Sequence, residues 1–408
     1  MIAKGILFSG PALTILLVVV VVIVLFYDTK MSNELYVIEE KKKQLKYDNW
    51  ETYDESKANS PTTAKSRSIM LLHGYTPFWN AGSEVCAHTV NRRLVEKGHE
   101  VWVGVPGYPN VIYEGVHIFN ADNRVLLHNL MKHTHVIGTH SFRERCMKLS
   151  TQYGAAYVDW LHGGTFTAVV RNSVKSTDSK IWAVFNSESL VQSFSDYKDV
   201  KYQILRPPVS WQEYEVKDKD KDRDQIYVTL SNLNESKGGQ IFIDIAKITP
   251  NVQFLGVRGS YWKQIEDKSV PNITYIDNTP RIKDVYAKTK ILIMPSREET
   301  WGRTAIEAMS SGIPVIAAPT PGLKECCMDA ALFVERDDIQ EWSRLINRLC
   351  NDKSFYDEFS NRGKIRAKQL EPTHDLELFQ EWFEKEVVPS AKFVERPPTL
   401  LQKFLDIV

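Results

Sequence analysis

The sequence has no excess of either charge sign. Its 408 residues include 51 Lys and Arg against 51 Asp and Glu, so the formal net charge is zero. Phosphate contacts dominate nucleic-acid affinity, so a chain without a global cationic field is a poor match to nucleic acid as its main partner. Apolar residues make up 43% of the chain, which excludes a disordered protein. The composition predicts a globular protein of two or three domains.

Cysteine is scarce, and its spacing excludes common site types. The five cysteines include the adjacent Cys326 and Cys327, but no C-x-x-C pair and no Cys/His cluster at zinc spacing. An odd count with a vicinal pair is unlike a disulfide framework. No G-x-G-x-x-G motif follows an expected strand, which argues against a nicotinamide dehydrogenase. The sequence therefore predicts neither a zinc site nor a nicotinamide-binding fold.

One segment lacks charge altogether. Gly5–Tyr27 is a run of 23 uncharged residues, and a helix of that length, at about 1.5 Å per residue, spans the ~30 Å hydrocarbon core of a bilayer. We expect residues 1–28 to form an uncleaved transmembrane anchor. The alternative is a cleaved signal peptide, against which stand the length of the run and the absence of a small-residue cleavage site after it. Five lysines from Lys30 to Lys46 follow the run and only Lys4 precedes it, so the positive-inside rule predicts a single-pass protein with a cytosolic catalytic part.

The rest of the chain divides into a tether and two α/β halves. Residues 29–67 have the composition of a tether. Short apolar strands then alternate with helical stretches over 68–209, and the alternation resumes over 225–375 after a linker at 210–224 that contains a run of alternating charges. This pattern predicts two doubly wound, Rossmann-like domains with parallel sheets, which face a cleft beyond the carboxyl ends of their strands.

The most informative stretch is Met294–Ala318, where a buried strand is followed by a polar loop and by a helix from about Gly302. A helix that begins just after a strand points its free N–H groups into the cleft, where they can hold an anion such as a diphosphate. Glu299 in the loop can accept hydrogen bonds from a polyol. Glu307, after seven intervening residues, can accept them from a ribose diol. The alternative is two solvated carboxylates at a helix start.

This stretch resembles the E-x7-E region of the retaining "group 1" glycosyltransferases, which have the two-Rossmann GT-B fold. The resemblance extends from about Ser68 to Phe383. The other matching segments, in chain order, are Asn80–Glu84, Gly98–Val101, Leu161–Gly164, Asn186–Glu188, Pro207–Val209 and Asn234–Gly239. They look like the Gly-rich first loop, the "GHEV" strand, the His-bearing loop, the "NS" helix start, the end of the first domain and the "EKGG" phosphate loop.

The resemblance implies a set of site residues. Its catalytic members are Glu299 and His162, and its nucleotide-sugar-binding members are Gly82, Lys237, Arg258, Gly302, Arg303, Thr304 and Glu307. Many family members have a phosphate-binding Arg where this chain has Asn232, so Arg258 and Arg303 are the candidates for the missing charge. His162 has an alternative role, a histidine that is hydrogen-bonded only within its loop.

The resemblance also implies an activity. It predicts a membrane-anchored, retaining hexosyltransferase that needs neither a metal nor a cofactor and that moves a sugar from a nucleotide-diphosphate donor to a hydroxyl of a glycan or lipid-linked acceptor. The first domain would bind the acceptor and the second the donor, and helices in 376–408 would cross back to the first domain. Two alternatives stay open: a nucleotide-sugar epimerase of the same fold, and a catalytically inactive membrane scaffold.

Overall fold

The computed structural model describes residues 50–51, 53, 55–162, 180–194, 201–217 and 226–393. The chain separates into two compact units, 1–50 and 51–408, and the second is the one described here. The anchor expected over 1–28 lies outside the described residues. Within the described part of the chain, no helix is long and apolar enough to cross a membrane.

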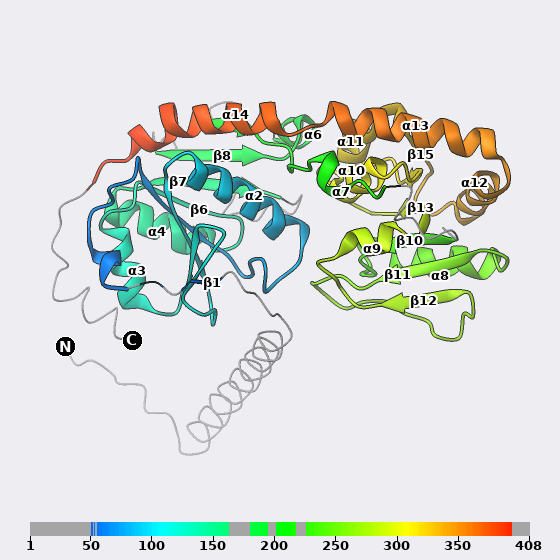
Figure 1. The fold of residues 1–408 in the computed structure, drawn as a ribbon, viewed down its shortest axis with the longest axis horizontal. Coiled ribbons are helices and arrows are strands. Elements are labelled where there is room, and N and C mark those ends of the chain that lie inside the picture. Colours follow the sequence, from blue (N-terminus) through cyan, green and yellow to red (C-terminus); the bar gives the residue numbers. More distant parts are fainter. Residues whose placement is uncertain are drawn as a thin grey trace, which may run out of the picture. The chain divides into compact units, whose positions relative to one another are not determined.

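The N-terminal lobe is built on a mainly parallel sheet (Figure 1). Its strands are β2 (Arg67–Leu71), β3 (Glu100–Val105), β4 (Val111–Tyr113), β5 (Val116–Asn120), β6 (Val136–Thr139), β7 (Ala156–Leu161), β8 (Ile181–Phe185) and β9 (Tyr202–Ile204). Their order across the sheet is β4-β5-β3-β2-β6-β7-β8-β9. The α-helices of this lobe are α2 (Gly82–Glu96), α3 (Arg124–Met131), α4 (Arg143–Tyr153) and α6 (Glu188–Gln192). Central strands such as β2 and β7 are buried at every position, because parallel strands are covered on both faces.

One strand pair of this lobe departs from the expected parallel pattern. β4 and β5 pair antiparallel and form a hairpin. Its two central residues, Glu114 and Gly115, both have positive φ angles, 48° and 80°. A two-residue turn of this kind matches the twist of the flanking strands. The sequence does not predict this turn, because Asn or Asp, and not Glu, is the usual residue before the glycine.

The N-terminal lobe begins within the segment that the sequence assigns to the tether. A 3₁₀ turn, η1 (Glu55–Asn59), packs beside α3, and its Ala58 is fully buried. The carbonyl of Ala58 accepts a 3.0 Å hydrogen bond from Arg67, whose guanidinium also contacts Glu100 at 2.9 Å. Residues 55–67 are therefore part of the folded lobe.

The C-terminal lobe has a fully parallel sheet. Its strands are β10 (Tyr227–Ser231), β11 (Gln253–Val257), β12 (Ile273–Ile276), β13 (Thr289–Met294), β14 (Val315–Ala317) and β15 (Ala331–Phe333), in the order β12-β11-β10-β13-β14-β15. The α-helices are α7 (Trp211–Tyr214), α8 (Gly239–Ile248), α9 (Ile282–Tyr286), α10 (Arg303–Ser310), α11 (Pro321–Cys327), α12 (Ile339–Asn351) and α13 (Lys353–Gln369). The chain winds to one side of β10 and then to the other. Ligands of such sheets bind beyond the strand ends at this switch point.

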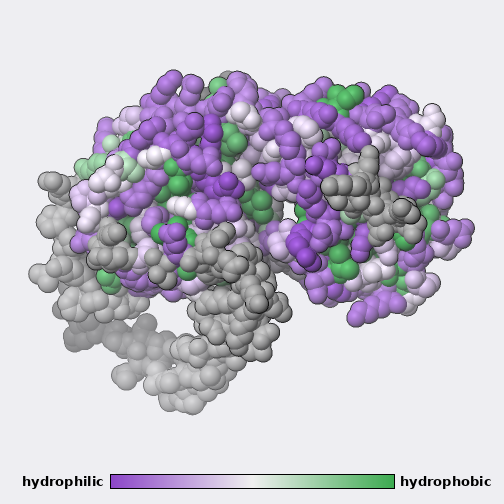
Figure 2. All heavy atoms as spheres, in the orientation of Figure 1, coloured by the Kyte–Doolittle hydropathy of each residue, from purple (hydrophilic) through white to green (hydrophobic). Residues whose placement is uncertain are grey.

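The last long helix, α14 (Thr373–Trp382), leaves the C-terminal lobe and runs along the N-terminal one (Figure 1). Asp375 at its start lies 3.2 Å from the guanidinium of Arg206. Trp382 at its end packs edge-on against Trp182 of β8, with ring centroids 5.7 Å apart. Figure 2 shows a largely hydrophilic face that is hollowed between the two lobes. The expected α/β fold of two domains with parallel sheets is confirmed.

Candidate active site

Two loops of the C-terminal lobe place a lysine and a glutamate in hydrogen-bonding contact. Lys237 lies between β10 and α8, and its ammonium donates a hydrogen bond to Glu299, which follows β13. The hydroxyl of Ser296 donates to the same carboxylate oxygen at 3.3 Å. The loops can approach because Gly238 has a φ of +90° and because a Cβ there would lie 2.5 Å from the carbonyl oxygen of Pro295. The side chains of Lys237 and Glu299 remain 28% and 15% exposed, so a ligand can reach both.

The N-terminus of α10 lies directly after this loop. Gly302 is the N-cap residue, with a φ of +134° and no side chain that could cap the helix. The N–H groups of the first turn, including those of Arg303 and Thr304, have no partner within the helix itself. Together with the helix dipole they favour an anion at this point. The ammonium of Lys237 and this helix end therefore give this part of the site two positive features.

Glu307 and Arg303 form a buried ion pair on α10. Their side chains are 10% and 11% exposed, and Arg303 Nε lies 2.7 Å from a Glu307 oxygen. The other oxygen of Glu307 accepts a 2.8 Å hydrogen bond from Tyr286. Arg303 also donates to the carbonyl of Pro208 at 2.9 Å and to the hydroxyl of Tyr214. Each Glu307 oxygen can accept one further hydrogen bond. A ribose hydroxyl bound there would share that oxygen with Arg303 or Tyr286.

The other candidate cation, Arg258, is already paired with two carboxylates. The guanidinium of Arg258 is paired with Glu266, at 2.6 and 2.8 Å, and with Asp277 at 2.8 Å. These carboxylates raise its pKa and already neutralise its charge. Gly82, in contrast, is the first residue of α2 and lies close to α10. A Cβ built on it would lie 3.8 Å from Cδ of Arg303.

His162 follows β7 and meets the Glu299 loop across the cleft. Its backbone carbonyl accepts a 3.0 Å hydrogen bond from Thr300. Its Nδ1 lies 3.1 Å from Nδ2 of Asn186, and its Nε2 is buried without a partner among the described residues. Burial, with the nearby His140 and Arg143, holds the pKa of His162 well below its usual value. The imidazole is therefore neutral at pH 7. Gly163 and Gly164 of the predicted His-bearing loop lie outside the described residues.

The lobes also touch at the start of α2, near Gly82, through residues that the sequence did not single out for this role. Tyr261, in the loop after β11, donates its hydroxyl to Glu84, which is fully buried on α2. Ser260 donates to the carbonyl of Asn80 at 2.5 Å. Nothing in the local pattern marks Tyr261, because an aromatic residue in an irregular loop has no characteristic spacing.

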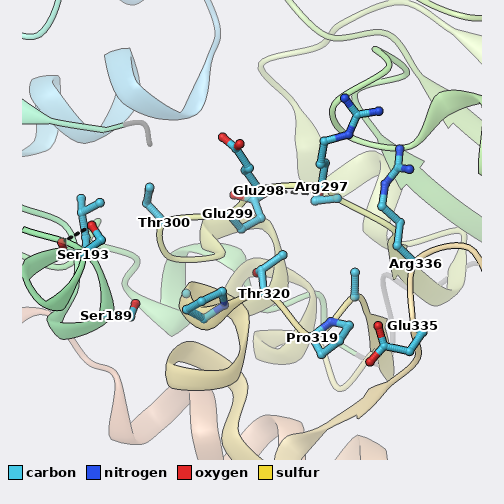
Figure 3. Close-up of a pocket in the computed structure, with 15 residues that line it drawn as sticks. Ser189, Ser193, Arg297, Glu298, Glu299, Thr300, Pro319, Thr320, Glu335 and Arg336 are labelled. Atoms are coloured by element: carbon cyan, nitrogen blue, oxygen red, sulfur yellow. Dashed lines mark hydrogen bonds between the residues drawn. The ribbon is translucent and has the colours of Figure 1, made fainter. Parts of the chain in front are cut away.

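A cavity of 480 Å³ opens beside Glu299. Figure 3 shows Ser189 of α6 and Ser193, just after that helix, on one side of it and Thr320 and Pro319 on the other, with Arg336 beyond. Glu325 of α11 accepts hydrogen bonds from the backbone N–H groups of Glu188 and Ser189, at 3.0 and 2.8 Å. Both lobes therefore form the cavity wall. In the part of the chain that the structure describes, no group of three or more His, Cys, Asp or Glu side chains could hold a metal ion.

Residues 212–366 match the family of glycosyl transferases group 1. The expected resemblance to the group 1 glycosyltransferases is thereby confirmed over these residues. An uncharacterized glycosyltransferase of Methanocaldococcus jannaschii is 30% identical over 143 residues, which are 33% of this chain and 40% of that protein. The O-antigen chain mannosyltransferase B of Escherichia coli is 33% identical over 86 residues, 21% of this chain and 23% of that protein. The chain thus spans less than half the length of these curated relatives.

Solved structures share the fold over a larger part of the chain. The Anabaena protein Alr3699/HepE, in complex with UDP and glucose, has a TM-score of 0.64 at 15% identity, and the match covers 78% of this chain and all of that one. The sucrose-phosphate synthase of Thermosynechococcus elongatus has a TM-score of 0.63 at 15% identity, with 80% and 100% covered. At this level of identity the likeness establishes the two-lobed architecture alone.

Proposed function

We propose that this chain is a glycosyltransferase that moves a sugar from a nucleotide diphosphate to a hydroxyl acceptor. The observation that carries the proposal is the pairing of Glu299 with Lys237 at the open end of α10, with His162 held against the same loop by Thr300. A carboxylate, an ammonium and a helix N-terminus match the hydroxyls and the diphosphate of a nucleotide sugar. The relatives and the UDP-bound neighbour support the same substrate class.

Each group has a role in this proposal. Departure of the diphosphate leaves about two negative charges on the leaving group, which Lys237 and the N–H groups of Arg303 and Thr304 would stabilise. Glu299 would accept hydrogen bonds from sugar hydroxyls, and the imidazole of His162 would contact the sugar from the other lobe. Gly82 would let the backbone approach the phosphates. In this proposal Lys237 and the helix N–H groups stabilise the leaving group, and the reaction uses neither a metal nor a cofactor.

The finer parts of the proposal rest on the sequence and on relatives. We propose retention of anomeric configuration from the family resemblance, and we assign no protein nucleophile. A hexose donor and a glycan acceptor agree with the mannosyltransferase relative. Membrane anchoring and a cytosolic catalytic part rest on the uncharged run Gly5–Tyr27 and the lysines that follow it. An anchor would suit an acceptor that is itself lipid-linked.

Replacement of Glu299 by Gln tests the proposal. It keeps the shape of the side chain but removes the charge that holds Lys237, so sugar transfer should fall by about 10²–10³-fold. The matched control is Glu381→Gln, which breaks an exposed Glu–Lys pair at 3.1 Å on α14 and should leave transfer unchanged. Full-length protein would be incubated with uridine, guanosine and adenosine diphosphate sugars and a glycan acceptor, with the product anomer read by NMR.

The outcomes separate the proposal from its alternatives. Equal transfer by Glu299→Gln and wild type would refute the assigned role of Glu299. Conversion of the donor sugar without an acceptor would identify an epimerase instead. No transfer and no thermal shift with any of the three donors would identify a scaffold.

A further inference from the structure

The hydrogen bonds behind His162 determine which of its nitrogens carries the proton. The indole Nε1 of Trp160 lies 3.2 Å from Oδ1 of Asn186, and both side chains are buried, at 3% and 2% exposure. An indole N–H can only donate. The amide of Asn186 must therefore present its oxygen to Trp160 and its NH₂ group to the opposite side.

On that opposite side the NH₂ group meets two acceptors. One is Nδ1 of His162 at 3.1 Å, and the other is the hydroxyl oxygen of Thr300 at 3.5 Å. The hydroxyl of Thr300 donates its hydrogen bond to the carbonyl of His162, so its oxygen can accept one from Asn186. Both contacts agree with the amide orientation that Trp160 requires.

We propose that Trp160 and Asn186 hold His162 in the Nε2–H tautomer, so that the ring donates a hydrogen bond to a substrate oxygen and does not transfer protons. An Nδ1 that accepts from Asn186 carries no proton, and the neutral ring then has its proton on Nε2. That Nε2 is buried and has no acceptor among the described residues. A substrate oxygen beside it would satisfy the N–H group.

This arrangement excludes a general-base role for Nε2 of His162, because the nitrogen has no lone pair to offer. Asn186 is a positioning residue, since it acts through His162. Thr300, next to Glu299 in the sequence, joins the same network from the C-terminal lobe. The contacts of Thr300 thus form only when the lobes are together, whereas Trp160 and Asn186 both belong to the N-terminal lobe. The substrate contact rests on the proposed function, whereas the tautomer does not.

The tautomer can be measured directly. Full-length protein with ring-¹⁵N-labelled histidine would be studied by long-range ¹H–¹⁵N NMR at pH 7, with the His162 signals assigned by their loss in His162→Gln. We expect a protonated Nε2 and an unprotonated Nδ1. An Nδ1–H tautomer, or an imidazolium, overturns the inference.

Asn186→Asp is the decisive variant. The carboxylate still accepts from Trp160 but cannot donate to His162, so it should draw the proton to Nδ1 and raise the basicity of the ring. We expect the tautomer to invert, kcat/KM to fall by about tenfold or more, and a pH dependence near neutrality that the wild type lacks. Asn347→Asp, which alters an amide bonded to Ser343 on α12 at 2.9 Å, should change none of these.

Two further results complete the test. If Asn186→Asp does not fold, Trp160→Phe removes the indole donor, and we expect a mixture of both tautomers. A single Nε2–H tautomer in either variant overturns the inference even if the rate falls, because loss of rate alone is a structural effect. Titration with the uridine, guanosine and adenosine diphosphate sugars should shift the Nε2 signal. An Nε2–H tautomer that responds to none of them refutes the substrate contact and the proposed function, while the role of Asn186 stands.

Discussion

The buried pair of Arg303 and Glu307 offers a test of how the start of α10 is held. Arg303 is 11% exposed and donates to Glu307, to the carbonyl of Pro208 and to the hydroxyl of Tyr214. Arg303→Met keeps most of the volume of the side chain but removes all of its side-chain hydrogen-bond donors. Glu307 is then left as a buried carboxylate with Tyr286 as its remaining donor.

The expected cost follows from that burial. Removing one partner of a buried ion pair costs about 3–5 kcal/mol, because the other charge loses its compensation. A unit of about 150–250 residues loses about 2–4 °C in Tm per kcal/mol, so we expect the C-terminal lobe to melt about 6–20 °C lower. The matched control is Arg344→Met on α12, whose pair with Glu341 is also short, at 2.6 Å, but whose arginine is 59% exposed. That exposed pair should contribute at most about 0.5–1 kcal/mol.

Calorimetry of the wild type, both single variants and the double variant Arg303→Met/Glu307→Gln would measure these effects. The double variant removes the uncompensated charge, so it should recover part of the loss. If Arg303→Met melts no lower than Arg344→Met, or if the double variant melts lower still than Arg303→Met, the reasoning is wrong.

Two other predictions concern a buried histidine of the N-terminal lobe and a contact between the lobes. Burial lowers the pKa of His140 from 6.5 to about 3, so as pH falls the unfolded chain takes up this proton first and stability is lost between about pH 6.5 and 3. Between pH 7 and 5, urea unfolding of the wild type should therefore lose about 2 kcal/mol more than that of His140→Gln, and equal losses would contradict this. Tyr261→Phe removes the hydrogen bond to Glu84 across the lobes, worth about 1.5–3 kcal/mol. X-ray scattering should show a larger radius of gyration, and an unchanged radius would show that this contact does not hold the lobes together.

The sequence alone was sufficient for the alternation of strands and helices and for the main loops of the site. Parallel strands such as β2 and β13 read as short apolar runs because both of their faces are buried. Gly238 and Gly302 stand where the backbone takes positive φ angles, of 90° and 134°, and such positions favour glycine whatever surrounds them. These features are local, so a local pattern reveals them.

The sequence analysis did not identify the partners of two candidate site residues. Arg258 was a candidate phosphate ligand, but Glu266 and Asp277 neutralise it. Glu307 was expected to face a ribose, and it lies paired with Arg303. The partners of Arg258 come together through loop geometry without a fixed spacing, whereas Arg303 and Glu307 are an i,i+4 pair on α10, a spacing that the sequence does contain. The β4–β5 hairpin was also hidden, since its turn begins with Glu114, a residue that rarely takes a positive φ.

The sequence by itself determined the α/β class, the two lobes, the resemblance to the group 1 glycosyltransferases and the uncharged run at the N-terminus, because each depends on residue types at short spacing. Only the tertiary structure decided what His162 can do. The amide of Asn186 determines the tautomer of His162, and Trp160 determines the orientation of that amide. Thr300 donates a hydrogen bond to the His162 carbonyl from the other lobe. Asn186 meets Trp160 and His162 because β7 and β8 are neighbours in the first sheet, and Thr300 joins them only when the second lobe packs against the first. The direction of a hydrogen bond, and the chemistry that depends on it, is therefore decided by the tertiary structure.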